Sequence, residues 1–247
     1  MQSEKAVVET IKLVADYHTH TVFSHGKGTI EENVKEAVAK GLKEIAITDH
    51  GFGSFAIGLK HEDIPVMRQE IDRLKKTYPI EIYLGVEANL YSFEGDLDVS
   101  LEETKLFDII IFGAHQVAKP KNFKTLIGWW VRNLTKQTKK KIGENTKAYI
   151  EVIKRYKPKI IVHPNRGCKI DCGAVAKVAA EHGTLIELNG SCGSFTQKEI
   201  DDILAAGANF VIDSDAHEAR NVGEFPAIKK LMQNVNIPLS RIVNIKH

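Results

Sequence analysis

Histidines gather at one repeated kind of position in this chain, the downstream ends of short apolar runs that look like β-strands. Seven of the ten histidines lie there, together with one glutamate and one aspartate. In a parallel barrel the carboxyl ends of all strands meet at one rim, so side chains distant in sequence can come together. The pattern therefore predicts a multinuclear metal site formed by His18, His20, His25, His50, Glu87, His115, His163, Asp215 and His217.

The spacing within this set suits metal binding. Side chains alternate along a strand, so His18 and His20 lie on one face and can reach the same cation. Asp215 and His217 repeat that spacing, and Glu87 offers two oxygens that can bridge. The donors exceed what one tetrahedral ion requires, so we expect two or three ions. Imidazole-rich, thiolate-free coordination favours Zn²⁺, with Mn²⁺ or Fe²⁺ as alternatives, over Mg²⁺ and Ca²⁺.

The elements that must position these residues alternate between β-like runs and amphipathic segments, such as 29–40 and 174–182, which predicts repeated βα units. Gly41, Gly183 and Gly207 fall where helices should end in a left-handed cap. Six expected strands end in a proposed ligand, and one ends in Asn189. The seven strands are expected at 12–18, 44–49, 80–87, 108–114, 159–163, 184–189 and 209–214. At 247 residues the chain fits one α/β barrel, so we expect a single domain over 1–247.

Composition limits the class of protein. A formal charge of +2 and 43% hydrophobic residues indicate an ordinary globular protein with no global attraction to nucleic acid. No apolar run reaches the roughly 20 residues of a membrane span, and the first residues lack a secretory pattern. The odd set of Cys168, Cys172 and Cys192 does not predict a disulfide framework. We expect a cytoplasmic protein that does not bind a membrane.

One interval, 119–147, differs from the rest. It lies between the fourth and fifth expected strands and holds nine Lys or Arg against one acid, Glu144, a local charge of +8. It also holds Trp129 and Trp130. The interval could attract an anionic substrate and stack aromatic rings against it. Alternatively, it is a solvated helical face whose tryptophans pack on the barrel or on another subunit, so a homo-oligomer is possible.

A family resemblance follows from these motifs. The series His18-Thr-His20, His25, Thr48-Asp-His50, Gly85-Val-Glu87, His115, His163-Pro164 and Ser214-Asp215-Ala-His217 resembles the polymerase and histidinol phosphatase (PHP) family nearly end to end. Within it, Gly85-Val-Glu-Ala-Asn89, Ile170-Asp-Cys-Gly-Ala-Val175, Glu187-Leu-Asn-Gly-Ser191 and Gly223-Glu-Phe225 resemble the stand-alone YcdX-like phosphatases.

The resemblance implies a distorted (β/α)7 TIM-like barrel with three divalent ions. By this similarity His18, His20, Glu87 and Asp215 would hold one ion. Glu87, His115 and His163 would hold its bridged neighbour. The third ion would be held by His25, His50 and His217.

Such clusters generate hydroxide by lowering the pKa of a bridging water, and they neutralise phosphoryl charge in the transition state. We therefore expect hydrolysis of small-molecule phosphate monoesters, as in a histidinol phosphatase. Glu87, Asp215 and His217 are the catalytic candidates; Asp215 or a neighbouring histidine is a possible general acid beside a metal-bound water. Asp16 and Asp49, close in sequence to ligands, are candidates to orient histidine rings.

Phosphate needs cationic partners besides the metals. Arg166, Lys119 and Arg220 each follow a proposed ligand by three or four residues and are the candidates for substrate binding. Other functions stay open: a nuclease that holds single-stranded nucleic acid on the 119–147 interval, or a metal-dependent amidohydrolase. A non-catalytic PHP module is a further alternative, against which stands the complete set of nine ligand positions.

Overall fold

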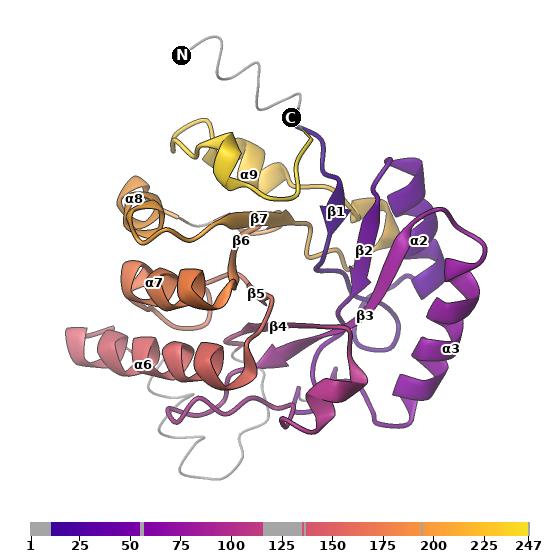
Figure 1. Ribbon diagram of the computed structural model, residues 1–247, viewed down its shortest axis with the longest axis horizontal. Coiled ribbons are helices and arrows are strands. Elements are labelled where there is room, and N and C mark those ends of the chain that lie inside the picture. The colour runs from indigo at the N-terminus through magenta and orange to yellow at the C-terminus, as the bar shows by residue number, and fades with distance from the viewer. Residues whose placement is uncertain (1–10, 55–56, 116–134, 136, 194, 247) are drawn as a thin grey trace.

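Seven parallel strands follow one another in chain order, each hydrogen-bonded to the next, in the computed structural model (Figure 1). The structure describes residues 11–54, 57–115, 135, 137–193 and 195–246. The strands are β1 (Ala15–Asp16), β2 (Glu44–Ile47), β3 (Glu81–Asn89), β4 (Ile109–Gly113), β5 (Ile160–Ile161), β6 (Leu185–Asn189) and β7 (Phe210–Asp213). They form a nearly closed barrel, and the expected (β/α)7 fold is confirmed.

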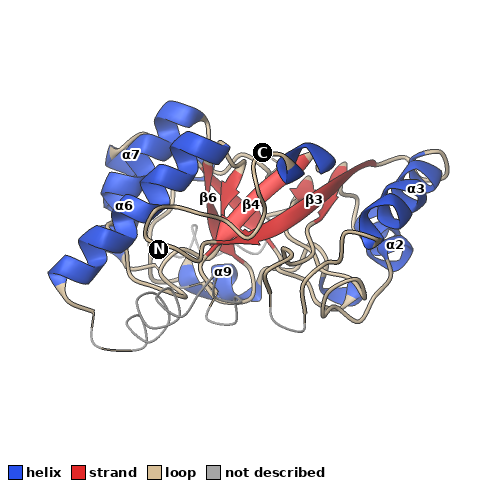
Figure 2. Cartoon of the chain, turned by 90° about the horizontal axis from the view of Figure 1, so that it is seen from below, coloured by secondary structure: helices blue, strands red, loops and turns tan. Residues whose placement is uncertain are grey.

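Helices connect the strands and cover the outside of the sheet. Figure 2 shows the strands at the centre, with α6 and α7 on one side and α2 and α3 on the other. The helices are α2 (Ile30–Ala39), α3 (Asp63–Lys75), α6 (Lys139–Tyr156), α7 (Cys172–His182), α8 (Gln197–Ala205) and α9 (Pro226–Leu231). Among the described residues, short 3-10 segments lie at Glu103–Leu106, Ala219–Asn221 and Leu239–Arg241. Within the described ranges, no helix is long and apolar enough to cross a membrane.

Local sequence explains where these helices begin and end. Thr29 caps α2 and forms a capping box with Glu32, so two backbone N–H groups that would lack partners are satisfied. The predicted glycine caps are confirmed: Gly41, Gly183 and Gly207 have φ of 79°, 70° and 87°, a region that other residues rarely adopt.

The apolar core has two layers separated by the sheet. The larger layer packs between strands and helices and contains side chains such as Met67, Phe112 and Tyr149. A smaller cluster is formed by Ala46, Ile109, Ile111, Ile160, Val162 and Val211, with Tyr17 and Tyr83 packed against it. Side chains alternate between the two faces of a strand, so Asp213, two residues after Val211, lies on the same inner face as this cluster. It is nearer the carboxyl end of its strand. Polar groups there are buried above an apolar floor.

The seam between β1 and β7 is closed by few bonds. On the rim side, the N–H of His20 donates to the carbonyl of Ala216 at 2.8 Å. On the other side Asn244 fills the gap: its Nδ2 donates to the carbonyls of Ala15 and Ile212, at 2.8 and 2.6 Å, and its Oδ1 accepts from the N–H of Ile212 at 3.0 Å. A buried amide from the end of the chain thus completes the barrel.

Strands β1 and β5 are much shorter than expected, and part of one predicted interval is helical. β1 has two residues because Asn244 takes the place of regular pairing at the seam. β5 also has two, since the chain turns at His163, where φ is 30°. The last nine residues of the 119–147 interval begin α6, whereas 119–134 and 136, including Lys119 and both tryptophans, lie outside the described residues.

Replacing Asn244 by alanine should destabilise the barrel. The change leaves the N–H of Ile212 and the carbonyl of Ala15 buried without their partner, so we expect the free energy of unfolding to fall by about 2–4 kcal/mol. Urea denaturation measures this. Asn234→Ala, at an exposed asparagine, is the matched control and should change stability little; equal losses in both variants would contradict the seam argument.

Candidate metal centre

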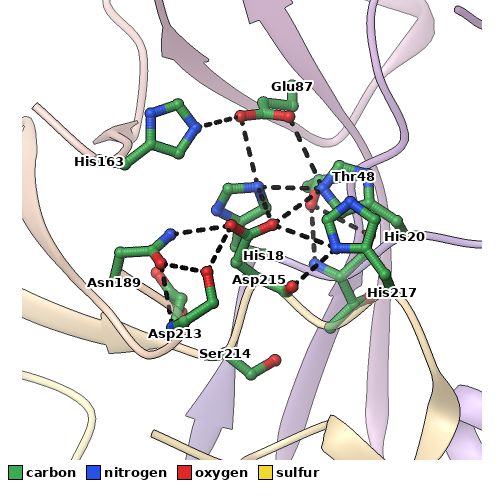
Figure 3. A network of polar contacts seen from close by, with 12 residues as sticks. His18, His20, Thr48, Glu87, His163, Asn189, Asp213, Ser214, Asp215 and His217 are labelled. Atoms are coloured by element: carbon green, nitrogen blue, oxygen red, sulfur yellow. Dashed lines mark hydrogen bonds and ion pairs between the residues drawn. The ribbon is translucent and has the colours of Figure 1, made fainter. Parts of the chain in front are cut away.

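All nine predicted ligand residues lie together at the rim of the barrel, as Figure 3 shows for six of them. His18 and His20 follow β1, and His25 lies farther along the same loop. Glu87 belongs to β3. The others follow β2, β4, β5 and β7, as His50, His115, His163, and the pair Asp215 and His217.

Glu87 occupies the centre of the cluster and is fully buried. Its Oε1 lies 2.9 Å from His163 Nε2, 3.2 Å from His115 Nε2 and 3.4 Å from His18 Nε2. Its Oε2 lies 2.7 Å from His50 Nδ1. The two oxygens thus face different groups of imidazoles, which is the arrangement a bridging carboxylate requires.

Asp215 faces the pair of histidines after β1. Its Oδ1 lies 3.5 Å from His18 Nε2 and 3.4 Å from His20 Nε2. These two nitrogens are 3.1 Å apart, so both point into the same volume. His18, His20 and Asp215 together offer three donor atoms within 4.8 Å of one another.

The remaining histidines surround a neighbouring volume. The ring of His25 lies 4.2 Å from that of His217 and 4.7 Å from that of His50, measured between centroids. The donors form overlapping triads: His20, His50 and His217; His18, His20 and Asp215; His18, Glu87 and His163; and His50, Glu87 and His115. Because the triads share members, the division of the nine residues among three ions stays a prediction.

The residues fit a cation chemically. Four buried ligand atoms have no hydrogen-bond partner among the described residues: His20 Nδ1, His50 Nδ1, His163 Nδ1 and Glu87 Oε2. A buried polar atom left without a partner costs about 1–3 kcal/mol. The close approach of His50 Nδ1 to Glu87 Oε2 lacks hydrogen-bond alignment. A cation beside His50 Nδ1 and Glu87 Oε2, which lie 2.7 Å apart, would satisfy both, whereas His20 and His163 turn their other nitrogen, Nε2, toward the cluster.

The electrostatics of the site favour ligating forms at Glu87, His115 and His20, but not at His18. Burial would raise the pKa of Glu87, but interaction with the neighbouring imidazoles of His115, His18 and His50 outweighs it and holds the pKa well below its usual value. Burial lowers the pKa of His115 to about 4 and that of His20 well below the ordinary range. Ionised carboxylates and neutral imidazoles are what a metal needs. At His18 burial is outweighed by Glu187 and Glu87, which raise the pKa.

Glu187 orients His18. Its Oε1 lies 2.6 Å from His18 Nδ1, which leaves Nε2 to face the cluster. Its Oε2 accepts from the backbone N–H of His163 at 2.5 Å and from Asn189 Nδ2 at 2.9 Å. One carboxylate therefore holds residues from β1, β5 and β6 in place. The sequence analysis named Glu187 only within a family motif and gave it no role; it lies on β6, two residues before Asn189.

Asn89 orients the ring of His115 in the same way. Its Oδ1 accepts from His115 Nδ1 at 2.6 Å, so Nε2 faces Glu87. Asn89 is itself held by Asp98, which accepts from its N–H and its Nδ2, both at 2.7 Å. Burial raises the pKa of Asp98 to about 6. The sequence carries no spacing signal for Asp98.

Asp16 and Asp49 do not orient histidine rings, in contrast to the expectation. Asp49 accepts from the N–H and Oγ1 of Thr21, at 2.7 and 2.6 Å, and from Ser24 Oγ at 2.5 Å. Asp16 accepts from Oγ of Ser214 at 2.5 Å and the N–H of Gly223 at 2.8 Å. Both carboxylates are buried and hold the loops that carry His25 and the last ligands, because the nearest donors belong to those loops.

Two ligand candidates adopt strained backbone. His163 and Asp215 have φ of 30° and 55°, in the left-handed region that is costly for residues other than glycine. Gly113 makes room for the turn: a Cβ there would lie 2.6 Å from Cε1 of His163. The chain thus leaves regular strand geometry where His163 turns toward Glu87 and Asp215 turns toward His18 and His20.

The structure separates the three candidates for substrate binding. Arg166 lies at the rim with its Nη1 3.5 Å from Asp215 Oδ2 and its side chain 53% exposed. Arg220 is 80% exposed and pairs with Glu218 at 2.6 Å rather than with a histidine or acid of the cluster. Lys119 lies outside the described residues.

Residues 16–214 match the PHP domain. A probable phosphatase of Caldanaerobacter subterraneus is 32% identical over 95% of this chain and 88% of its own length, and probable phosphatase YcdX of Shigella flexneri is 32% identical over 93% and 89%. The fold resembles histidinol phosphate phosphatase of Lactococcus lactis, solved with zinc, L-histidinol and phosphate (TM-score 0.61, 20% identity, 89% and 91% coverage).

Removing the Glu187 carboxylate should weaken metal binding. Glu187→Ala frees the His18 ring to rotate and releases Asn189, so we expect zinc affinity to fall about 10–100-fold. Competition of the metal-free protein with a chelating dye measures the change. Glu181→Ala on the exposed end of α7 is the control; if both variants bind zinc like the parent protein, Glu187 does not orient a ligand.

Proposed function

Because the chain belongs to the PHP domain family and is a metal-dependent phosphoesterase, we propose that it hydrolyses small-molecule phosphate monoesters at a trinuclear site, as a histidinol phosphatase does. The observation that carries the proposal is the buried Glu87 carboxylate with imidazoles on both of its oxygens. Two volumes that share one carboxylate suit ions that clamp the two reacting oxygens of a phosphate ester.

When bound, divalent ions supply Lewis acidity and make hydroxide available near neutral pH. The chain's own residues do the positioning. Glu87, whose Oε1 and Oε2 face separate imidazoles, would help to hold two ions, and Asp215, whose Oδ1 faces His18 and His20, would hold one of them together with that pair. All nine proposed ligands would hold the three ions, with zinc first and manganese or iron as alternatives.

Arg166 would receive the phosphoryl group. Its guanidinium is half exposed beside Asp215, so an incoming dianion can reach it without first breaking a buried pair. A planar guanidinium binds two phosphate oxygens at once. Lys119 and Arg220 stay candidates for the same role, and Asp215 or His217 for proton transfer to the leaving oxygen.

The comparisons support the substrate class. Relatives that align with most of this chain are named probable phosphatases. The Lactococcus lactis structure holds L-histidinol and phosphate, the two products of hydrolysis of a phosphate monoester. A cytoplasmic location and a homo-oligomer stay predictions. So does the amidohydrolase alternative, which the family match does not favour.

A nuclease has one observation in its favour. The helix α6 begins with Lys139, Lys140 and Lys141, of which the first two are exposed. A lysine run can hold a phosphodiester backbone, and such binding weakens steeply with salt. Cleavage of a single-stranded oligonucleotide would therefore distinguish a nuclease from a monoesterase.

Phosphate release from a panel of compounds tests the proposal. We expect the metal-loaded protein to release phosphate from histidinol phosphate, an aryl phosphate and nucleotides, but not to cleave a single-stranded oligonucleotide. Chelation should abolish turnover, and zinc, manganese or iron should restore it. No release from any monoester by protein of known metal content would overturn the proposal, and cleavage of the oligonucleotide alone would replace it with the nuclease.

Arg166→Met should impair substrate use but not metal binding. The change keeps the apolar stem and removes the guanidinium, so we expect KM for the aryl phosphate to rise about 10-fold or more, because a charge-assisted hydrogen bond is lost. Steady-state kinetics at saturating metal measure it. Arg73→Met, on the outer face of α3, should leave KM unchanged; an unchanged KM and kcat in Arg166→Met would exclude Arg166 from binding.

A further inference from the structure

Asn189 ends β6, which corresponds to the one expected strand that carries no proposed ligand, and the structure places its side chain among the ligands (Figure 3). It is buried, at 3% exposure. Its Nδ2 donates to Glu187 Oε2 at 2.9 Å and to Asp215 Oδ2 at 3.2 Å. Its Oδ1 accepts from the backbone N–H groups of Ser191 and Cys192, both at 3.0 Å. Every part of this amide is in use.

The two carboxylate oxygens of Asp215 contact different groups. Oδ2 is surrounded by donors: Asn189 Nδ2 at 3.2 Å, Ser191 Oγ at 3.0 Å and Arg166 Nη1 at 3.5 Å. Oδ1 is thereby directed toward His18 and His20, as described above. The orientation of a proposed metal ligand therefore depends on the amide next to it.

The same amide reaches the rim where substrate would enter. The turn after β6 is held to Asn189 Oδ1 by Ser191 and Cys192, and Cys192 Sγ lies 3.7 Å from Arg166 Nη1. The contacts of Asn189 thus run from Glu187 at the base of the cluster to the turn beside Arg166.

We propose that Asn189 is a positioning residue that couples the metal position of His18, His20 and Asp215 to the turn beside Arg166. The inference rests on the proposed function. An amide is required because the site presents two carboxylates to one end of the side chain and N–H donors to the other. Aspartate has the same shape but lacks the donor.

Two substitutions separate this role from simple packing. Asn189→Asp keeps the volume but places a third carboxylate oxygen near 2.9 Å from Glu187 and 3.2 Å from Asp215. Asn189→Ala removes volume without adding charge. If the donor is what matters, Asn189→Asp should bind zinc about 10–100-fold more weakly than the parent and more weakly than Asn189→Ala. If packing matters, the order reverses.

The experiment titrates metal-free protein with zinc, and then measures KM and kcat on an aryl phosphate at saturating zinc. Asn244→Asp is the matched control, because it changes a buried amide that bonds only to backbone at the barrel seam. We expect Asn244→Asp to lower the melting temperature but to retain parental zinc affinity in the folded protein. In Asn189→Asp we expect weaker zinc binding and a higher KM.

Equal zinc affinity in Asn189→Asp and the parent, or weaker binding in Asn189→Ala than in Asn189→Asp, would overturn the inference. So would an unchanged KM in Asn189→Asp. The parent protein decides the proposed function separately: a parent that binds zinc but hydrolyses no monoester refutes that function, whereas the ranking of zinc affinities still tests the positioning role.

Discussion

The burial of an ionised carboxylate among imidazoles is the interaction on which the rest of the rim depends. Glu87 lies out of contact with water, and charge in such a place is costly unless neighbours compensate for it. Histidine nitrogens that follow several different strands compensate for this charge. Each of those imidazole rings therefore has to turn the correct nitrogen toward Glu87. A histidine can present either nitrogen, and the choice is made by what the other nitrogen contacts.

That requirement explains the polar layer behind the ligands. Glu187 and Asn89 each occupy the Nδ1 of one histidine, and both are themselves held by further hydrogen bonds. Asn189 and Asp98 thus hold Glu187 and Asn89 in the positions from which they contact these histidines. Such networks are stable only when every member has its partners, because an unpaired polar group in a buried site is expensive.

The barrel has adapted to the same requirement. Strands β1 and β5 are short, and backbone strain occurs at His163 and Asp215, where ladder bonds are given up so that side chains can turn inward. Stability is regained elsewhere: in the apolar floor inside the barrel and at the seam, where Asn244 replaces missing strand pairing. The strained backbone at the rim costs free energy of folding, and packing elsewhere in the fold has to offset that cost.

The sequence by itself determined the seven strands, the glycine caps and the nine residues that meet at the rim. These features are local: periodicity, turn residues and position at a strand end are all written in short stretches of chain. Only the tertiary structure decided which atoms face one another. It showed that Glu187 orients His18 and that Asn89 orients His115. It also showed that Asp16 and Asp49 accept hydrogen bonds from loops rather than from histidine rings. Whether two groups form a hydrogen bond depends on the distance and angle between them. For groups on strands far apart in sequence, the spacing along the chain determines neither.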